Sequence, residues 1–261
     1  MHRIVSLFFP LAALATLLAC TTVQDTGRKQ LILTPASQEN KMGVSQFNNY
    51  KKSKRVSSNA SYNGRLRSVA RRLEPIFQRR MPGSQWEFVV FEDQTPNAFA
   101  LPGGKVGIHT GMFQLVQNDA QLAAVIGHEV GHVVARHGGE RMTSQLLGAA
   151  ATILTGVAMR DAAATQRNTT VAAVGAASTL GVLRFSRSQE LEADQLGALY
   201  MAQAGYDPRQ SIELWKRMAA YRQRAGGGKK VPAYFSTHPS DEQRIQRLRA
   251  FMPEAMAQWR G

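Results

Sequence analysis

The segment from His128 to His132 reads HEVGH, which places two imidazoles and one carboxylate at spacings suited to metal-dependent hydrolysis. Residues four apart in a helix are separated by about 400° of rotation, so His128 and His132 project from one face and can bind one metal ion. Glu129 lies one step aside, where its carboxylate can take a proton from an activated water without ligating the metal. The spacing predicts a zinc hydrolase; a helix with two structural histidines is the alternative.

A third ligand is expected in the segment ELEAD, which begins at Glu190, 58 residues beyond His132 (190 − 132). Glu190 and Asp194 share a helix face by their i,i+4 spacing, whereas Glu192 points elsewhere. We assign Glu190 as the third zinc ligand and Asp194 as the acceptor that fixes a histidine tautomer through its ring N–H. An ordinary solvated acidic helix face is the alternative interpretation.

The pattern of apolar residues predicts a mostly helical α+β chain around these groups. The catalytic helix is expected from about Ala120 until Gly138-Gly139 ends it. A brief strand is expected at 31–33, and longer ones at 86–91 and 98–108, the second bent at residues 102–104 and paired with the first. Further helices are expected within 37–50 and at 62–80, 189–204, 208–224 and 240–252, the last with Ser240 and Gln243 as a capping box.

Residues 144–159 and 169–183 are rich in Ala, Gly, Thr and Leu, and a polar break at 160–168 separates them. Small residues let two helices approach closely, so a helical hairpin is expected here. Each arm is too short for a comfortable membrane span. We therefore interpret the segment as a packed hairpin or a mobile lid.

The amino-terminal sequence predicts export and lipidation. Residues 1–19 form a basic and then apolar signal peptide, and Leu17-Leu18-Ala19-Cys20 looks like the lipobox of bacterial lipoproteins. Cys20 is the only cysteine, and a free or intermolecular thiol is the alternative role for it. We expect residues 20–28 to be a short lipidated tether in the periplasm, at the outer membrane because Thr21 rather than Asp follows, and residues 29–261 to be the zinc peptidase domain.

The chain has a formal net charge of +14, and 31 − 18 = +13 remains once Arg3 is removed with the signal peptide. A basic amino-terminal third favours anionic lipid as a partner, although solvated helix faces explain it equally well. Export and the lack of aromatic residues interleaved with the basic ones exclude nucleic acid as the expected partner.

Together, HEVGH and ELEAD resemble the paired motifs of the CAAX-prenyl-protease-like family of zinc metallopeptidases, especially its branch of bacterial periplasmic lipoproteins and exported proteases. The similarity extends from about Gly27 to Leu248. It implies a zinc-dependent endopeptidase with one zinc ion per chain and a gluzincin-like fold that places a small β-sheet beside the catalytic helix. It also supports Glu190 over Glu192 as the ligand.

Two further features follow from this resemblance. The stretch Asn97-Ala98-Phe99-Ala100, followed by Leu-Pro-Gly-Gly, is similar to the family's edge strand, which could hold an extended substrate; a plain sheet strand is the alternative. His238 is similar to a histidine of exported members that reaches the zinc and holds the enzyme inactive. Stabilisation of the transition state is the competing role for His238.

Three functions follow as hypotheses. The first is an envelope endopeptidase that cleaves misfolded or unassembled envelope proteins. The second is a self-inhibited, chaperone-like outer-membrane assembly factor with little proteolysis, for which envelope assembly machinery is the expected partner. The third is a module that binds anionic lipid through its basic surface.

Overall fold

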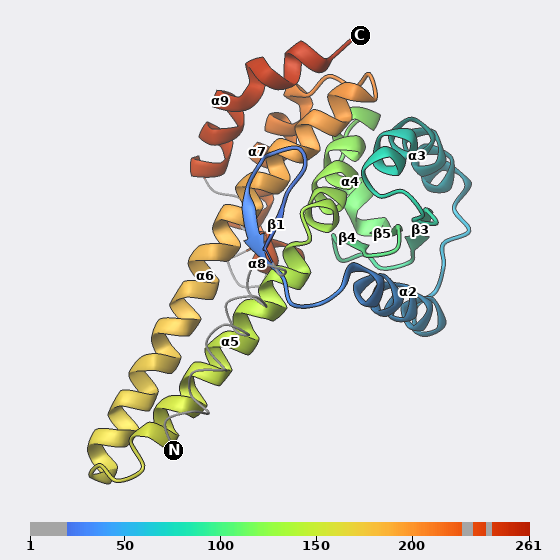
Figure 1. Cartoon of the computed structure of the whole chain (residues 1–261). Helices are drawn as coiled ribbons and strands as arrows, with labels where there is room; N and C mark the ends of the chain where they lie inside the picture. The colour runs from blue at the N-terminus through green and yellow to red at the C-terminus, as the bar shows by residue number, and fades with distance from the viewer. Residues whose placement is uncertain (1–19, 226–231, 239–241) are drawn as a thin grey trace. The chain divides into compact units, whose positions relative to one another are not determined.

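The computed structural model describes residues 20–225, 232–238 and 242–261, so the predicted signal peptide and the capping residue Ser240 lie outside the described residues. The chain divides into two compact units. Unit 1 comprises residues up to Pro35 together with Arg136–Ser188, and unit 2 comprises Ala36–Ala135 together with Gln189–Gly261. Figure 1 shows the ribbon with its helices and strands labelled.

Unit 2 contains a small sheet and most of the helices. Its elements are α2 (Ala36–Ser53), α3 (Ala60–Arg80), β3 (Glu87–Phe91), β4 (Ala98–Leu101), β5 (Lys105–His109), the 3-10 helix η1 (Thr110–Gln114), α4 (Asp119–Val134), the carboxyl-terminal part of α6 (Ala164–Gln203), α7 (Arg209–Ala225), α8 (Ala233–Thr237) and α9 (Glu242–Gln258). The mostly helical α+β class predicted from the sequence is confirmed.

The three-stranded sheet has the order β3-β5-β4, with β5 parallel to β3 and antiparallel to β4. The prediction of one bent strand over 98–108 is wrong, because this segment forms two strands joined by a tight turn. Gly103 and Gly104 have φ values of 88° and 81°. Glycine adopts this left-handed region without a steric penalty, so the chain reverses there and β4 folds back along β5. All five residues of β5 are buried.

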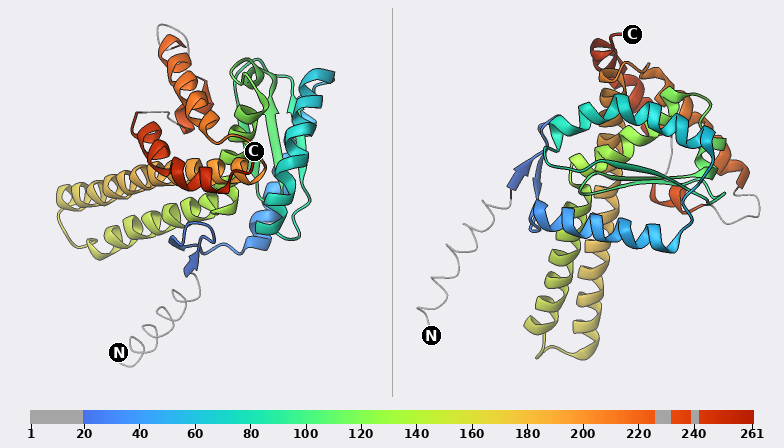
Figure 2. Two further views of the ribbon diagram at one scale, coloured as in Figure 1. Left: turned by 90° about the horizontal axis from the view of Figure 1, so that it is seen from above. Right: turned by 90° about the vertical axis from the view of Figure 1, so that its right-hand side faces the viewer.

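Helices cover both faces of this sheet. The right-hand view of Figure 2 shows α2 on one side of the strands and α3 on the other. The core between them contains fully buried Phe47 from α2, Leu73 and Phe77 from α3, and Phe91 and Ile108 from the strands. Helix α4 contacts both α3 and β4, so the sheet and α3 fix the position of the predicted catalytic helix.

In its described residues, unit 1 contains a short β-hairpin and two long helical segments. Strands β1 (Cys20–Thr22) and β2 (Lys29–Leu31) pair antiparallel, so the segment predicted as a tether contributes a strand. Helix α5 (His137–Ala158) runs beside the amino-terminal part of α6, as Figures 1 and 2 both show. The predicted helical hairpin is therefore present, with a turn at residues 159–163.

Two predicted helix boundaries are wrong. Helix α4 ends at Val134, before the glycine pair, because Arg136 adopts the left-handed conformation with φ 54°; Gly138 and Gly139 lie inside α5. The predicted helices at 169–183 and 189–204 are one helix of 40 residues, α6. No proline or positive-φ glycine separates them, so the backbone continues without a break.

None of the helices in the described ranges combines the length and the apolar character needed to cross a bilayer.

Candidate active site and metal centre

The HEVGH segment lies in the second half of α4, a helix that is buried nearly all round. Asn118 caps its first turn by accepting a hydrogen bond from the backbone N–H of Gln121 at 2.9 Å. Every residue from Gln121 to Gly131 is buried. The helix is therefore held by packing on all sides, which fixes the directions of His128 and Glu129.

Two glycines bring α4 and α6 into backbone contact at this site. A Cβ atom on Gly197 would lie 2.8 Å from the backbone nitrogen of His128, and one on Gly127 would lie 3.0 Å from the carbonyl oxygen of Gly197. The 2.8 Å contact with backbone leaves no room for a side chain at Gly197, and Gly127 has almost none, so the two helices cross with their backbones in close contact. Glu190 and Asp194 on α6 are consequently brought against the histidines of α4.

Four side chains converge here: His128, His132, Glu190 and His238. The Nε2 atoms of His128 and His132 lie 3.2 Å apart, and the Nε2 of His132 lies 3.2 Å from Oε1 of Glu190. The Nδ1 of His238 lies 3.2 Å from the Nε2 of His128 and 3.0 Å from Oε2 of Glu190. Ligands held at about 2.0–2.1 Å around a tetrahedral zinc are about 3.3 Å from each other, so this donor set fits zinc in number, type and spacing.

A second set of contacts holds two of these ligands in place. Oδ1 of Asp194 lies 3.0 Å from Nδ1 of His128, on the side of the ring away from the convergence point. Arg244 of α9 donates from Nε and Nη2 to the two oxygens of Asp194 at 2.8 and 2.7 Å. Its Nη1 also lies 3.2 Å from Oε2 of Glu190. Arg244 therefore pairs with both buried carboxylates at once.

The charges at the site are strongly coupled. Burial disfavours protonation of His128, but Asp194 and Glu190 outweigh it and raise the pKa of His128 to about 9. Burial would raise the pKa of Glu190, yet its hydrogen bonds with the three histidines hold that pKa well below its usual range. For Asp194 burial is likewise outweighed, chiefly by Arg244, and the pKa is lowered. Both carboxylates thus stay anionic, as a cation site requires.

Glu129 is close to this cluster but outside it. Its carboxylate is buried, and Oε1 lies 3.9 Å from Nε2 of His238. Burial raises the pKa of Glu129, opposed in part by the charges of His238 and His128. A carboxyl group with a raised pKa exchanges protons more readily near neutral pH, which suits a general base. The position of Glu129 beside the cluster therefore suits the role of a general base.

Sequence reasoning did not find Arg244, Trp215 or Tyr234. Trp215 of α7 lies between two site residues, with its ring 5.0 Å from that of His128 and 4.6 Å from the Arg244 guanidinium carbon. The ring of Tyr234 lies 4.8 Å from that of His238. Burial and the nearby Glu129 carboxylate raise the pKa of Tyr234 well above its ordinary value. None of these three residues belongs to a sequence motif with a recognisable spacing. Only the packing of α7, α8 and α9 places them at the site.

The predicted substrate strand is an edge strand of the sheet. Within the described residues β4 pairs only with β5, through registers such as Phe99 with Gly107. The opposite edge of the sheet is covered, because the backbone N–H of Ser57 donates to Val90 at 2.8 Å and that of Glu92 donates to Arg55 at 2.8 Å. The segment from Asn97 to Ala100 therefore lies at the more open edge.

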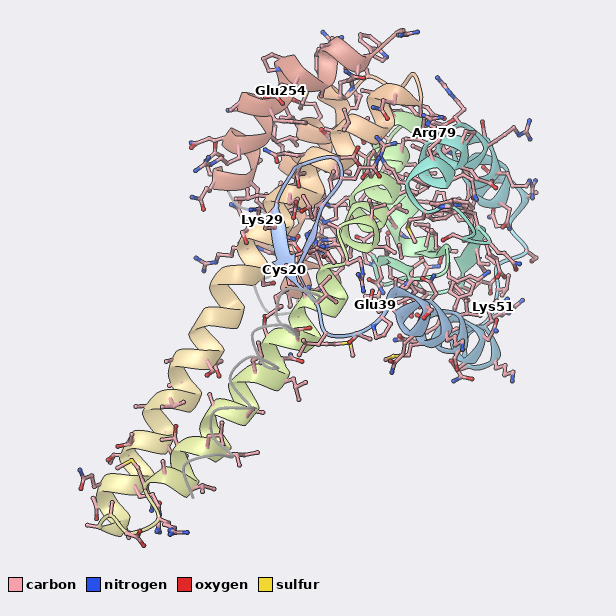
Figure 3. All side chains as sticks on the ribbon, in the orientation of Figure 1. Cys20, Lys29, Glu39, Lys51, Arg79 and Glu254 are labelled. Carbon is pink, nitrogen blue, oxygen red and sulfur yellow. The ribbon has the colours of Figure 1, made fainter. Side chains whose placement is uncertain are left out.

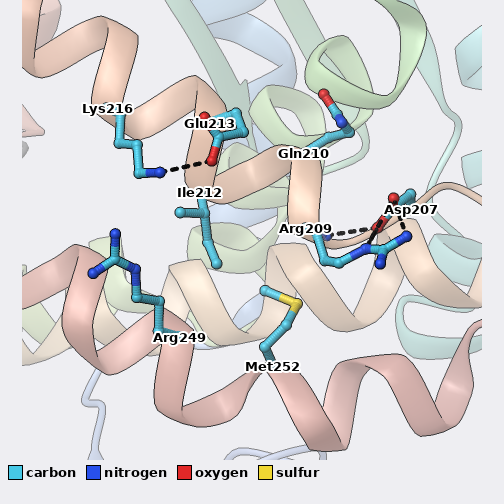
Figure 4. A pocket seen from close by; sticks show the side chains of 8 residues that line it. All are labelled: Asp207, Arg209, Gln210, Ile212, Glu213, Lys216, Arg249 and Met252. Carbon is cyan, nitrogen blue, oxygen red and sulfur yellow. Dashed lines mark hydrogen bonds and ion pairs between the residues drawn. The ribbon is translucent and has the colours of Figure 1, made fainter.

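A separate hollow of about 580 Å³ lies between α7 and α9, as Figure 4 shows. Its charged residues are already paired: Arg209 with Asp207 at 2.8 Å and Lys216 with Glu213 at 2.7 Å. It contains no histidine or cysteine, so it does not resemble the cluster of His128, His132, Glu190 and His238.

A helix with HEVGH, crossed by a second helix that supplies a carboxylate, defines the architecture of a metallopeptidase. The family model described as Peptidase family M48 matches residues 60–252, and the chain belongs to this family. Zinc is the metal that peptidases of the family use, and the donor set described above fits it.

The chain is similar to two proteins named mitochondrial metalloendopeptidase OMA1. It is 37% identical to that of Schizosaccharomyces pombe over 182 residues (67% of this chain and 49% of that protein) and 38% identical to that of Arabidopsis thaliana over 170 residues (64% and 32%). It is also 29% identical over 171 residues to the beta-barrel assembly-enhancing protease of Escherichia coli, covering 63% of this chain and 34% of that protein. The chain thus spans half or less of the length of these relatives.

Proposed function

We propose that the protein is a zinc-dependent endopeptidase of the bacterial cell envelope that cleaves misfolded or unassembled envelope proteins. The observation that supports this most is the convergence of His128, His132 and Glu190 beside the buried carboxylate of Glu129. In this proposal the first three residues bind one zinc ion per chain, and Asp194 orients His128 through its ring N–H.

Zinc, when bound, supplies Lewis-acid activation of water and of the scissile carbonyl. The residues of the chain handle the proton. Glu129 accepts a proton from the attacking water and then delivers it to the leaving amine. General acid–base catalysis of amide hydrolysis requires these two proton transfers in this sequence. Its burial and raised pKa support this role.

The substrate is proposed to bind as an additional strand along Asn97-Ala98-Phe99-Ala100. Main-chain hydrogen bonds to a free strand edge recognise any extended polypeptide, so an unfolded protein is the natural substrate class. The open edge of β4 and its contact with α4 support this placement.

The proposed location is the periplasmic face of the outer membrane, with Cys20 as a lipid attachment site. The sequence around Cys20 and the likeness to an envelope protease of Escherichia coli support it. Cys20 is exposed, as an attachment site must be.

Removal of zinc tests the proposal directly. We expect the zinc-loaded protein to contain one zinc ion per chain and to degrade unfolded casein, and we expect a chelator to abolish this degradation until zinc is added back. Gel electrophoresis and metal analysis measure the two quantities. Equal degradation with and without chelator would exclude a metal-dependent peptidase.

A second function is favoured by the position of His238. Its Nδ1 lies among the donor atoms of the proposed zinc ligands, at 3.2 Å from His128 and 3.0 Å from Glu190. A histidine that fills the open coordination position would hold the enzyme at rest. The protein would then act chiefly as a chaperone-like assembly factor, with envelope assembly machinery as its partner.

The variant His238→Ala distinguishes these functions. We expect casein degradation to rise, because the open coordination position is no longer filled. If about a tenth of the resting molecules have His238 away from that position, the rise is roughly tenfold. The neighbouring exposed residue provides the control Ser236→Ala, which should leave the rate unchanged. A lower rate in His238→Ala with unchanged zinc content would instead assign His238 to transition-state stabilisation.

A further inference from the structure

Helix α5 exposes a broad apolar face. Met142, Leu146, Ile153 and Val157 fall within about 60° of one another around the helix, at 100° per residue. Leu147 and Leu154 widen this face to about 140°. These six side chains are between 42% and 67% exposed, the largest value being that of Ile153. Proteins that stay free in solution rarely expose a continuous apolar surface of this extent, so the face is expected to have an occupant.

The charges near this face lie only at its ends. No Asp, Glu, Lys or Arg occurs between Arg141 and Arg160, a stretch of 18 residues (142 to 159) that is about 27 Å long in a helix. Arg160 and Asp161, which form an ion pair at 3.4 Å, follow at the turn, and Arg167 lies in the first turn of α6. Figure 3 shows side chains tipped with nitrogen and with oxygen at that turn, and mostly carbon along the described side chains of α5 beyond its first turns. An apolar face with arginines at both ends is typical of a helix that lies in the interface of a bilayer.

The β-hairpin that contains Cys20 is fixed to the start of this helix. Arg28 donates to both oxygens of Glu140 at 2.7 and 2.8 Å, and the backbone N–H of Leu33 donates to Oγ1 of Thr143 at 3.0 Å. Leu33 is itself 46% exposed. Cys20 pairs with Leu31 in the hairpin, so the proposed lipid attachment site and the apolar face belong to one unit. A membrane bound through Cys20 would lie within reach of α5.

A second copy of the chain is a poorer occupant than a bilayer. Antiparallel packing of two α5 helices would bring Arg141 of one copy against Arg160 of the other, and parallel packing would bring each arginine against its own equivalent. Parallel packing thus places like charges together, and in antiparallel packing Asp161, 3.4 Å from Arg160, offsets only part of the repulsion. Phospholipid phosphates instead complement these arginines and the net charge of +14.

We propose that the apolar face of α5, formed by Met142, Leu146, Leu147, Ile153, Leu154 and Val157, lies in the surface of an anionic phospholipid bilayer. This contact is separate from the lipid on Cys20 and does not depend on the peptidase activity. It holds unit 1 against the membrane along the length of α5.

Vesicle flotation tests the contact without the lipid anchor. The protein is the chain from residue 20 onward with Cys20→Ser, and the vesicles contain phosphatidylethanolamine with a minor share of phosphatidylglycerol. We expect this protein to float with the vesicles, and to remain bound in part at high salt because apolar side chains are buried. The double variant Leu146→Glu/Ile153→Glu should bind on the order of a hundredfold more weakly.

The control adds the same charge elsewhere. Gln46→Glu/Asn48→Glu changes two exposed residues of α2 and should still float. Circular dichroism and casein degradation show that both double variants are folded. An equal loss of flotation in the two variants would overturn the proposal, because binding would then follow net charge alone. A dimer in solution that the α5 variant converts to a monomer would also overturn it in favour of a second copy.

Discussion

Replacing Glu129 by Gln should lower the rate of peptide hydrolysis by about a hundredfold to ten-thousandfold, the usual contribution of a general base. Glutamine keeps the shape of the side chain but cannot accept the proton of the attacking water. Glu129 is not one of the four converging side chains, so zinc binding should persist. Single-turnover cleavage of a fluorescent peptide measures the rate, and metal analysis measures the zinc content.

The matched control for this variant is Glu213→Gln, an identical chemical change at an exposed residue of α7. It should leave both the rate and the zinc content unchanged. If Glu129→Gln retained full activity with zinc bound, Glu129 would have no role as the base. If the Glu129→Gln variant lost zinc together with activity, the role of Glu129 would be to hold the metal rather than to transfer the proton.

Replacing Arg244 by Met should destabilise the metal-free protein by about 3–5 kcal/mol. Arg244 is 4% exposed and bonds to both Asp194 and Glu190, so its removal takes the main compensating cation from Asp194 and one of several positive neighbours from Glu190. Zinc supplies positive charge beside Glu190 when it binds, and should therefore recover part of the lost stability. Urea denaturation with and without zinc measures the free energy of unfolding in each state.

Arg244→Met should also weaken zinc binding by about tenfold to a hundredfold, because Asp194 is no longer held against the ring of His128. Arg249→Met on the same helix is the control. Arg249 is half exposed and lies 4.0 Å from Glu242, so its loss should change stability by about 0.5 kcal/mol or less. If Arg244→Met and Arg249→Met changed stability and zinc affinity equally, Arg244 would have no specific role at the site.

The sequence predicted the parts of the site that depend on spacing within one helix. His128 with His132, and Glu190 with Asp194, are each four residues apart, and helical geometry alone places each pair on one face. The structure brings the two pairs together, and Asp194 lies against His128. The mostly helical fold class was predictable for the same reason, since apolar periodicity is a local property.

Arg244 was not predictable because it is one of several arginines near the start of α9, and nothing local distinguishes it from Arg247 or Arg249. Its role arises only when α9 packs so that one guanidinium is buried against Asp194. The extent of α6 was also missed. Small residues and a change of composition indicated two helices, but a helix ends only where the backbone changes direction, and composition does not determine that.

The backbone contact of α4 with α6 at Gly127 and Gly197 means that His128, His132 and Glu190 are preorganised. Two helices in backbone contact cannot shift along each other without a steric clash. We therefore expect the side chains of His128, His132 and Glu190 to keep the same separations with and without a cation. Little entropy is then lost when zinc arrives, so zinc is expected to bind more tightly than it would to mobile ligands. His238 follows α8, a helix of only five residues, and is outside this rigid frame. Any rearrangement that admits substrate is therefore expected at His238 and α8, while the frame stays fixed.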